Sequence, residues 1–141
     1  MKRLAPKPNA AFTLIEILLV IVIIVALMTA LLSTIASKMR EAKIHMAGIY
    51  VDTLAQEIGR YELTNGGPPS NDQGLRALVE KPTSQPIPRR WIQYLEKIEL
   101  DPWGMEYRYR FPGTVHPKGF DIYSSGPDRQ PDTADDIYNQ N

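Results

Sequence analysis

The strongest constraint on the fold of this chain is an uninterrupted apolar run near its amino terminus. Across residues 12–36 the only charged side chain is Glu16, and nearly all of residues 17–32 are aliphatic. About 20 apolar residues are enough to span a bilayer as a helix. Because apolar side chains surround such a helix on every face, it does not suit the surface of a soluble protein. We expect the run to lie in lipid or at the centre of a protein assembly.

A short basic segment, residues 1–11, precedes the apolar run and carries Lys2, Arg3 and Lys7. It resembles the start of a signal peptide, but the apolar run is longer than the ~7–15 residues usual there. A small-x-small pattern at residues 34–36 leaves ordinary signal-peptidase cleavage as an alternative. Basic residues flank the run on both sides, so the positive-inside rule does not settle its orientation.

Glu16 is the one charge within the apolar run. A carboxylate in a membrane helix costs roughly 2.5–3.5 kcal/mol at the centre, less near an end, and usually has a partner. No Lys, Arg or His occurs between Asn9 and Ser37. A cut between Ala11 and Phe12 would supply one cation, the new α-amine. Alternatively, Glu16 lies at the membrane interface, where the helix dipole favours it. The residues alone leave both interpretations open.

Beyond the apolar run, the pattern predicts that the helix continues as an amphipathic half, residues 37–64. Apolar residues recur there at spacings of three and four, as on one face of a helix: Ile44, Ala47, Val51, Leu54, Ile58 and Tyr61. The Asn-Gly-Gly-Pro-Pro sequence at residues 65–69 ends the pattern. We therefore expect one helix of about fifty residues whose second half needs a partner for its apolar face.

Residues 65–141 are expected to form a small globular head. A short helix capped at residues 70–72 ends before Pro82. Strict alternation of apolar and polar residues predicts two half-buried strands, over residues 105–111 and 120–124. The expected fold class is α+β, with a long amino-terminal helix packed on a small antiparallel sheet, and the tyrosines and tryptophans of the head in its core.

Composition excludes several classes of function. Sixteen basic side chains balance sixteen acidic ones, which argues against a nucleic-acid partner held by bulk positive charge. The chain has no cysteine, so disulfides, thiolate zinc sites and cysteine nucleophiles are excluded. No phosphate-binding glycine loop or nucleophile with a plausible base is visible. We therefore expect a protein that is not an enzyme.

Other charged residues are interpreted as solvated. His45 and His116 are expected to face water, and Arg108 and Arg110 to form the solvent side of the first strand. The pair at residues 89–90, both arginines, is a candidate contact for acidic neighbours in an assembly.

The last fifteen residues are unusually acidic. They contain Asp128, Asp132, Asp135 and Asp136, with only Arg129 as a nearby cation. Carboxylates crowded in one loop repel each other unless a cation or solvent screens them. Ca²⁺ suits such a loop because it accepts ~6–8 oxygen ligands in irregular geometry. The spacing does not match an EF-hand, so a solvated acidic tail and a calcium site both remain open.

The amino-terminal residues also match a known pattern. The sequence Ala-Phe-Thr-Leu-Ile-Glu at residues 11–16, followed by an aliphatic run, resembles the processing site of type IV pilins and type II secretion pseudopilins. The resemblance implies that a prepilin peptidase cuts between Ala11 and Phe12, with Ala11 in place of the usual Gly, and methylates Phe12. It also implies that Glu16 pairs with the terminal amine of a neighbouring subunit, that the leader is cytoplasmic, and that the head is periplasmic.

Sequences in the head narrow the resemblance to the major pseudopilins of type II secretion. The matching stretches are Tyr61-x-Leu-x-Asn65-Gly66, Gln73 to Pro82, Asp101-Pro-Trp-Gly104, and Ser125-Gly-Pro-Asp128 leading to Ile137. The absence of cysteine fits pseudopilins, because most major pilins close this region with a disulfide. The resemblance therefore implies the type IV pilin-like fold.

The resemblance also implies a Ca²⁺ site in the final loop. The residues matched to it are Asp128, Asp135 and Asp136 through their side chains, Ser125 through its backbone carbonyl, and Gln130 and Thr133 as weaker backbone candidates. A metal would be a useful addition, since a head of under about eighty residues commonly has a thin core.

The implied function is that of a structural subunit of a periplasmic pseudopilus. Such subunits leave the inner membrane and polymerise, and the growing filament drives exoproteins across the outer membrane. The implied partners are other copies of the chain, minor pseudopilins, the prepilin peptidase, an inner-membrane assembly platform and the lipid bilayer. The alternatives are a type IV or minor pilin with a role in adhesion or DNA uptake, and a signal-anchored periplasmic protein.

Overall fold

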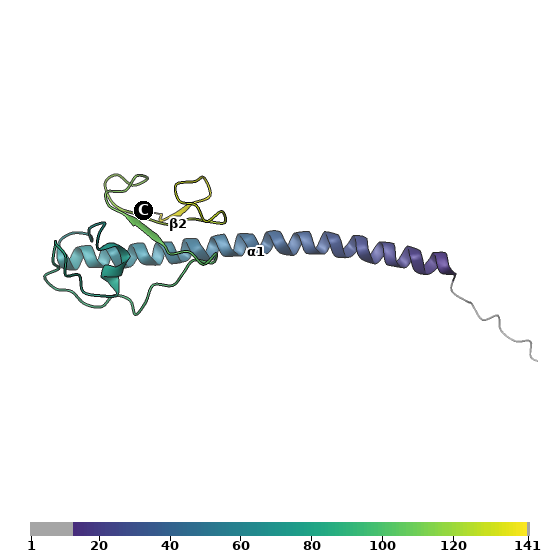
Figure 1. Ribbon diagram of the computed structural model, residues 1–141, viewed down its shortest axis with the longest axis horizontal. Helices are drawn as coiled ribbons and strands as arrows, with labels where there is room; N and C mark the ends of the chain where they lie inside the picture. The colour runs from purple at the N-terminus through teal and green to yellow at the C-terminus, as the bar shows by residue number, and fades with distance from the viewer. Residues whose placement is uncertain (1–12, 141) are drawn as a thin grey trace, which may run out of the picture. The chain divides into compact units, whose positions relative to one another are not determined.

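The computed structural model describes residues 13–140, and these residues form two helices and one small sheet (Figure 1). The elements in chain order are the α-helix α1 (Leu14–Asn65), the 3₁₀ helix η1 (Gly74–Leu78), and the strands β1 (Arg108–Arg110), β2 (Asp121–Ser124) and β3 (Ile137–Tyr138). The chain divides into two compact units, Met1–Met39 and Arg40–Asn141. The prediction of one long helix followed by a small antiparallel sheet is confirmed.

Local signals in the sequence set both ends of α1. At its start, the Glu16 N–H donates to the Thr13 side-chain Oγ1 at 3.3 Å and to the Thr13 carbonyl at 3.1 Å. Thr13 is thus the N-cap, which satisfies a backbone donor that has no partner inside the helix. At its end, Gly66 adopts φ +85°, and its N–H donates to the Glu62 carbonyl at 2.8 Å. A residue in this left-handed conformation ends a helix, and glycine adopts it without strain.

The large apolar side chains that the first unit contributes to α1 are all exposed. They range from 45% exposed at Val20 to 87% exposed at Leu14. Among the described residues, α1 is the one helix long and apolar enough to cross a membrane, with a mean hydropathy of 3.1 over its most apolar window and none of that window buried. Within residues 13–140, this part of the helix has no partner that covers its apolar surface.

The second unit buries one stripe of α1. Ala47, Val51, Leu54 and Ile58 are almost completely buried and pack in the core of the head, as the spacing predicts. Ile44, predicted to belong to this stripe, is instead 38% exposed. It lies one turn before Ala47, the first residue of α1 that the head covers.

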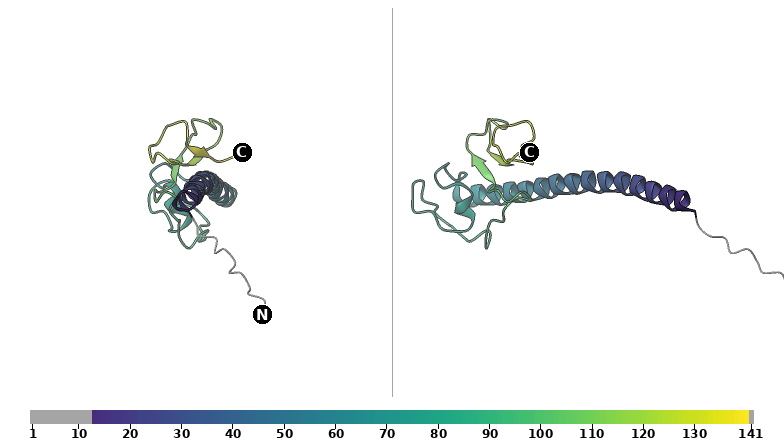
Figure 2. Two further views of the ribbon diagram at one scale, coloured as in Figure 1. Left: turned by 90° about the vertical axis from the view of Figure 1, so that its right-hand side faces the viewer. Right: turned by 45° about the vertical axis from the view of Figure 1, so that its right-hand side comes forward.

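The sheet has the order β1-β2-β3, and both pairings are antiparallel. Figures 1 and 2 show the sheet lying along one side of the carboxy-terminal part of α1. All four residues of β2 are buried, so the expected half-buried pattern is wrong there. Its outer face is covered because the loop of residues 112–119 folds over Asp121, and Tyr123 stacks on Tyr138 of β3, with ring centroids 4.8 Å apart.

Two other local predictions differ from the structure. The first strand begins at Arg108 rather than Met105, because the Met105 N–H donates to Asp101 Oδ1 at 2.8 Å, which holds this residue in a turn. The short helix is a 3₁₀ turn with Gln73 in the cap position and no side-chain cap. The Gln73 side chain donates instead to the carbonyls of Ser84 and Pro86, which anchors the following loop.

Candidate functional site

The amino-terminal site is only partly described. Ala11 and Phe12, the predicted cleavage and methylation positions, lie outside the described residues. Glu16 lies in the first turn of α1 with an exposed side chain, and no ion pair joins it to any residue in the described range 13–140. Sequence reasoning missed the role of Thr13, although Thr-x-x-Glu at residues 13–16 is a capping-box pattern.

The acidic loop begins directly at the end of β2. Ser125 and Gly126 are buried, and Gly126 adopts φ +64°. A Cβ placed on Gly126 would overlap the carbonyl oxygen of Asp135. The two arms of the loop are therefore in contact, and only glycine allows the backbones to approach so closely.

Hydrogen bonds bring four of the predicted calcium residues together. The Asp128 N–H donates to Asp135 Oδ2 at 3.2 Å, and the Gln130 N–H donates to Asp128 Oδ1 at 2.8 Å. The Thr133 hydroxyl lies 2.8 Å from Asp135 Oδ1 and 3.1 Å from the Gln130 carbonyl. The hydrogen bond from Thr133 holds the pKa of the Asp135 carboxyl below its usual range. The Asp135 carboxylate therefore stays charged in the fold.

Asp136, the third predicted carboxylate ligand, has different hydrogen-bond partners from the other four residues. Its Oδ2 accepts hydrogen bonds from the Asp132 N–H at 2.8 Å and from the Tyr138 hydroxyl at 3.3 Å. Burial, followed by the charge of Asp136, raises the pKa of Tyr138 to about 12. The other oxygen, Asp136 Oδ1, is buried without a hydrogen-bond partner, as is Oγ of Ser125. Buried carboxylate oxygens normally have a partner, so an unpaired one points to a missing cation or donor.

The described residues do not gather three or more carboxylate or histidine side chains closely enough to enclose a metal. Asp128 is exposed, whereas Asp135 and Asp136 are half-buried. The loop nevertheless contains carboxylate and carbonyl oxygens, which are the ligands that a hard cation needs. Backbone N–H groups form hydrogen bonds to the carboxylates and hold them in place.

Asp132 has a structural partner that the sequence did not suggest. Its Oδ1 accepts a hydrogen bond from Nη2 of Arg110 at 2.9 Å, and the Arg110 guanidinium also lies 5.8 Å from the ring centre of Tyr123. The expectation that Arg110 is simply solvated is wrong, because Asp132 of the acidic loop lies within hydrogen-bond distance of it. Arg108, by contrast, is exposed as expected.

A second connection joins the loop to the Asp101-Pro-Trp-Gly turn. The buried Asp101 carboxylate accepts the Ser124 hydroxyl at 2.6 Å, and the Gly126 N–H donates to that hydroxyl oxygen at 3.2 Å. The same carboxylate accepts the N–H groups of Trp103 and Met105. Asp101 therefore fixes the start of the acidic loop as well as its own turn. The sequence signalled the turn but not this longer contact.

Asp121 organises the loop between β1 and β2. Its carboxylate, fully buried, accepts the N–H groups of Thr114, Val115 and His116. Burial alone raises the pKa of Asp121, but these hydrogen bonds outweigh it and the pKa is lowered. His116 Nδ1 lies 3.1 Å from the same carboxylate. His116 is thus half-buried rather than solvated as expected, whereas His45 is exposed as expected.

The chain matches known families over almost its whole length. Residues 34–140 match the family described as type II secretion system (T2SS), protein G, and residues 6–32 match the prokaryotic N-terminal methylation motif. Type II secretion system core protein G of Pseudomonas aeruginosa is 39% identical over 124 residues, which cover 86% of each chain. Its counterpart in Dickeya chrysanthemi is 41% identical over 132 residues, covering 92% of this chain and 85% of the relative.

A solved structure agrees with these relationships. The crystal structure of the major pseudopilin from the type 2 secretion system of enterohaemorrhagic Escherichia coli matches with a TM-score of 0.67 at 39% sequence identity, over 73% of this chain and 87% of the other. The resemblance inferred from the motifs is thereby confirmed. The chain belongs to the type II secretion system protein G family, the family of the major pseudopilin.

Proposed function

We propose that this chain is the subunit of a periplasmic pseudopilus that drives exoprotein export across the outer membrane. The observation that carries the proposal is the exposed apolar part of α1, from Leu14 to Met39. Each Å² of apolar surface removed from water contributes about 25 cal/mol, so this surface needs a partner at every stage. Lipid covers it before assembly, and the same helix of neighbouring copies covers it afterwards.

The resemblance at the amino terminus supplies the assembly step. Prepilin peptidase removes residues 1–11 and methylates Phe12, and the new amine of Phe12 pairs with Glu16 of an adjacent copy. A carboxylate in an apolar environment is stabilised by such a partner, so the contact sets the axial register of the filament. Glu16 is available for it, because within residues 13–140 its side chain has no ion pair.

The remaining partners follow from this role. The chain is a single-pass protein of the inner membrane with its head in the periplasm, where an assembly platform extracts it into the filament. Minor pseudopilins join the same filament. The composition supports a structural role without a nucleic-acid partner, since acidic and basic side chains are equal in number.

The assembly proposal is tested by mass spectrometry and electron microscopy of the chain produced with its secretion system. We expect a mature chain that begins with N-methylated Phe12 and forms filaments. The Glu16→Ala variant should be processed and inserted in the membrane but should assemble poorly, whereas Glu41→Ala serves as a control outside the apolar run. A mature chain beginning at Ser37, or unimpaired filaments from Glu16→Ala, would contradict the proposal.

We also propose that the acidic loop binds Ca²⁺. The orphaned Oδ1 of Asp136 and the exposed carboxylate of Asp128 fit a hard, oxygen-seeking cation. Asp128, Asp135 and Asp136 would hold the ion with side-chain oxygens, and Ser125, Gln130 and Thr133 would contribute backbone carbonyls. The bound ion neutralises the repulsion among the carboxylates and stabilises the head, since it binds the folded loop alone.

The calcium proposal is tested by melting the head with and without a chelator. We expect chelation to lower the melting temperature of the unsubstituted chain. The melting temperature of the Asp128→Ala variant should not change on chelation. Asp72→Ala is a matched control, because Asp72 is also exposed but lies outside the loop. A melt of the unsubstituted chain that is indifferent to both chelator and added Ca²⁺ would refute the site.

A further inference from the structure

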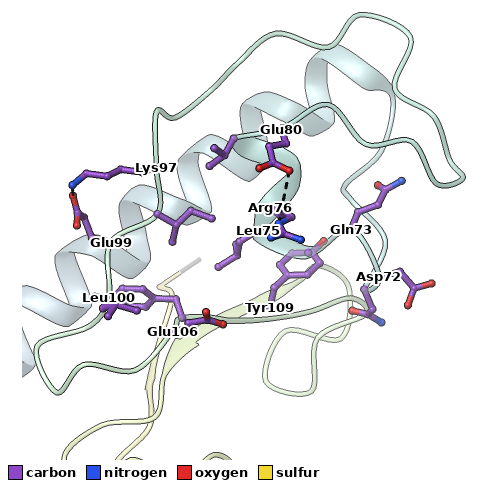
Figure 3. Close-up of a pocket in the computed structure, with 15 residues that line it drawn as sticks. Asp72, Gln73, Leu75, Arg76, Glu80, Lys97, Glu99, Leu100, Glu106 and Tyr109 are labelled. Carbon is purple, nitrogen blue, oxygen red and sulfur yellow. Dashed lines mark ion pairs between the residues drawn. The ribbon is translucent and has the colours of Figure 1, made fainter.

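The head carries a groove that lies outside both the apolar part of α1 and the acidic loop. It has a volume of about 660 Å³ and lies between η1, the segment of residues 97–100 and residues 106–109, where β1 begins (Figure 3). Leu75, Ile98 and Tyr107 are among the apolar residues that line it, and charged side chains surround them. The groove lies entirely within the second unit.

One wall of the groove includes Tyr109 of β1. Successive residues of an antiparallel strand direct their backbone groups to alternate sides. The backbone N–H and carbonyl of Ile122 both form hydrogen bonds with Asn139. Tyr109 pairs with Ile122, so the backbone N–H and carbonyl of Tyr109 point away from β2. Phe111 does the same, and its N–H and carbonyl each bond the Asn71 side-chain amide at 2.7 Å.

The backbone groups of Tyr109 point to this same outer side and have no hydrogen-bond partner among residues 13–140. An unpaired edge of a strand can accept a group from another chain. The groove therefore offers the Tyr109 carbonyl as an acceptor beside its side chains.

The charges of the groove are unevenly paired. Arg76 pairs with Glu80 at 3.9 Å and Lys97 pairs with Glu99 at 2.6 Å, as the dashed lines in Figure 3 mark. The other acidic residues of the lining, Asp72 and Glu106, are exposed and form no ion pair within the described part of the chain. The groove thus has an acidic excess and suits a cationic partner.

The complementary charge occurs elsewhere on the same head. Arg89 and Arg90 are exposed on the loop before Trp91, and neither forms an ion pair with another described residue. The Arg90 N–H donates to Asn65 Oδ1 at 3.2 Å, which places this basic pair at the carboxy-terminal end of α1.

The groove lies further back along α1. Its Tyr107 wall packs on Tyr50, with ring centroids 5.0 Å apart, and the Glu99 N–H donates to the Tyr50 hydroxyl at 2.9 Å. Tyr50 and Asn65 are fifteen residues apart on one helix, or about 22 Å at ~1.5 Å per residue. The basic and acidic surfaces are therefore displaced along the helix axis.

We propose that the groove between η1 and β1 binds the Arg89–Arg90 pair of a second copy of this chain. Two different surfaces that meet in this way form a heterologous contact, and such contacts build open-ended filaments. The axial displacement lets a copy shifted along α1 place its basic pair over the groove of its neighbour. The inference rests on the proposed function, because it requires copies to meet in a filament.

Arginine suits the groove for a chemical reason. Its guanidinium carries five N–H donors and no acceptor, so it bonds carboxylates and backbone carbonyls together. Glu106 and Asp72 supply the carboxylates, and the backbone carbonyl of Tyr109 supplies a further acceptor. The flat guanidinium also packs against tyrosine rings, and half-buried Tyr109 lines the groove.

Disulfide cross-linking tests the contact directly, since the chain has no cysteine of its own. Filaments of the Glu106→Cys, Arg90→Cys double variant are oxidised and separated by non-reducing electrophoresis. We expect a ladder of cross-linked copies. The Lys118→Cys, Arg90→Cys double variant is the control, because Lys118 is exposed but does not line the groove, and it should stay monomeric.

The outcomes separate the two claims. Filaments that form without the specific ladder overturn this inference and leave the proposed function intact. Failure of the unsubstituted chain to form filaments overturns both. Cross-links from the Glu106 position to a different protein, in place of a second copy, also overturn the inference.

Charge reversal gives an independent readout. Arg90→Glu and Glu106→Arg should each lower the yield of filaments by about fivefold, the upper range for an exposed ion pair. The double variant should recover to within about twofold of the unsubstituted chain, because the pair is restored with its charges exchanged. Lys118→Glu should change nothing. A double variant that assembles no better than either single one contradicts the contact.

Discussion

The two parts of α1 differ in how their apolar surface is covered. From Leu14 to Met39 the apolar side chains are exposed on all sides, whereas from Ala47 to Tyr61 one stripe of apolar residues is buried by the head, with Ile49 exposed outside that stripe. A helix with one apolar face is completed within its own chain, but a helix that is apolar all round needs lipid or other copies. The first part therefore encodes assembly, and the second encodes the stability of the head.

The largest expected contrast is between two leucines of this one helix. Leu54 is fully buried and Leu27 is 66% exposed. Leu54→Ala should lower the free energy of unfolding of the head by about 2–5 kcal/mol, because it leaves a cavity in the core. Leu27→Ala should leave it unchanged. Denaturation in detergent, followed by tryptophan fluorescence, measures both, and equal destabilisation by the two variants would contradict the division of α1.

An arginine introduced into each part of α1 also tests the difference between the two parts. Ile21→Arg should reduce membrane insertion, since an arginine at the centre of a spanning helix costs about 2.5–3.5 kcal/mol. Met46→Arg is the matched control, because Met46 is exposed on the part of α1 that belongs to the head. Membrane fractionation reports the difference. Equal insertion of Ile21→Arg and the unsubstituted chain would show that this part does not enter lipid.

Within the head, the Asp121 carboxylate should contribute most to stability at neutral pH. Asp121→Asn replaces one of the two carboxylate oxygens by an NH2 group, so at least one of the three backbone N–H groups loses its acceptor, which should cost about 1–3 kcal/mol. Because the folded pKa of Asp121 is lowered, its contribution is complete above the unfolded value of about 3.9 and is lost as the pH falls through the folded pKa. The difference between the two chains, measured by denaturation, should therefore shrink in acid. A constant difference from pH 7 to pH 3 would contradict this assignment.

The smallest effect is expected at the pair of Arg110 and Asp132. Both side chains are substantially exposed, at 34% and 59%, so solvent screens their attraction. Asp132→Asn should change the stability of the head by about 0.2–1 kcal/mol, less at high salt. A loss as large as that of Asp121→Asn would mean that this contact holds the acidic loop in place.

The sequence predicted the elements whose signals are local. The apolar run and its amphipathic continuation specify α1, and the glycines and prolines after Thr64 specify its end. The alternation around Tyr109 and Ile122 indicated the two longer strands. These patterns depend on neighbours within a few residues, so one sequence is enough to detect them.

The features that the sequence did not predict depend on distant contacts. β3 has two residues and exists because it pairs with β2, and Asn139 extends that pairing with its side chain. The contacts of Asp101 with Ser124 and of Arg110 with Asp132 join residues more than twenty positions apart. No local pattern encodes such partners. The calcium residues came from a resemblance, and their role stays a prediction.

We propose that the apolar part of α1 is shielded from water first by lipid and then by other copies. The most direct test of this proposal uses the single-cysteine variant Ile24→Cys and a water-soluble maleimide. We predict that this position stays unreactive both in intact membranes and in assembled filaments, while Lys118→Cys, on the head and outside the groove, reacts in both. Rapid labelling of Ile24→Cys in filaments, or a stable unprocessed monomer in water that labels there, would contradict the account.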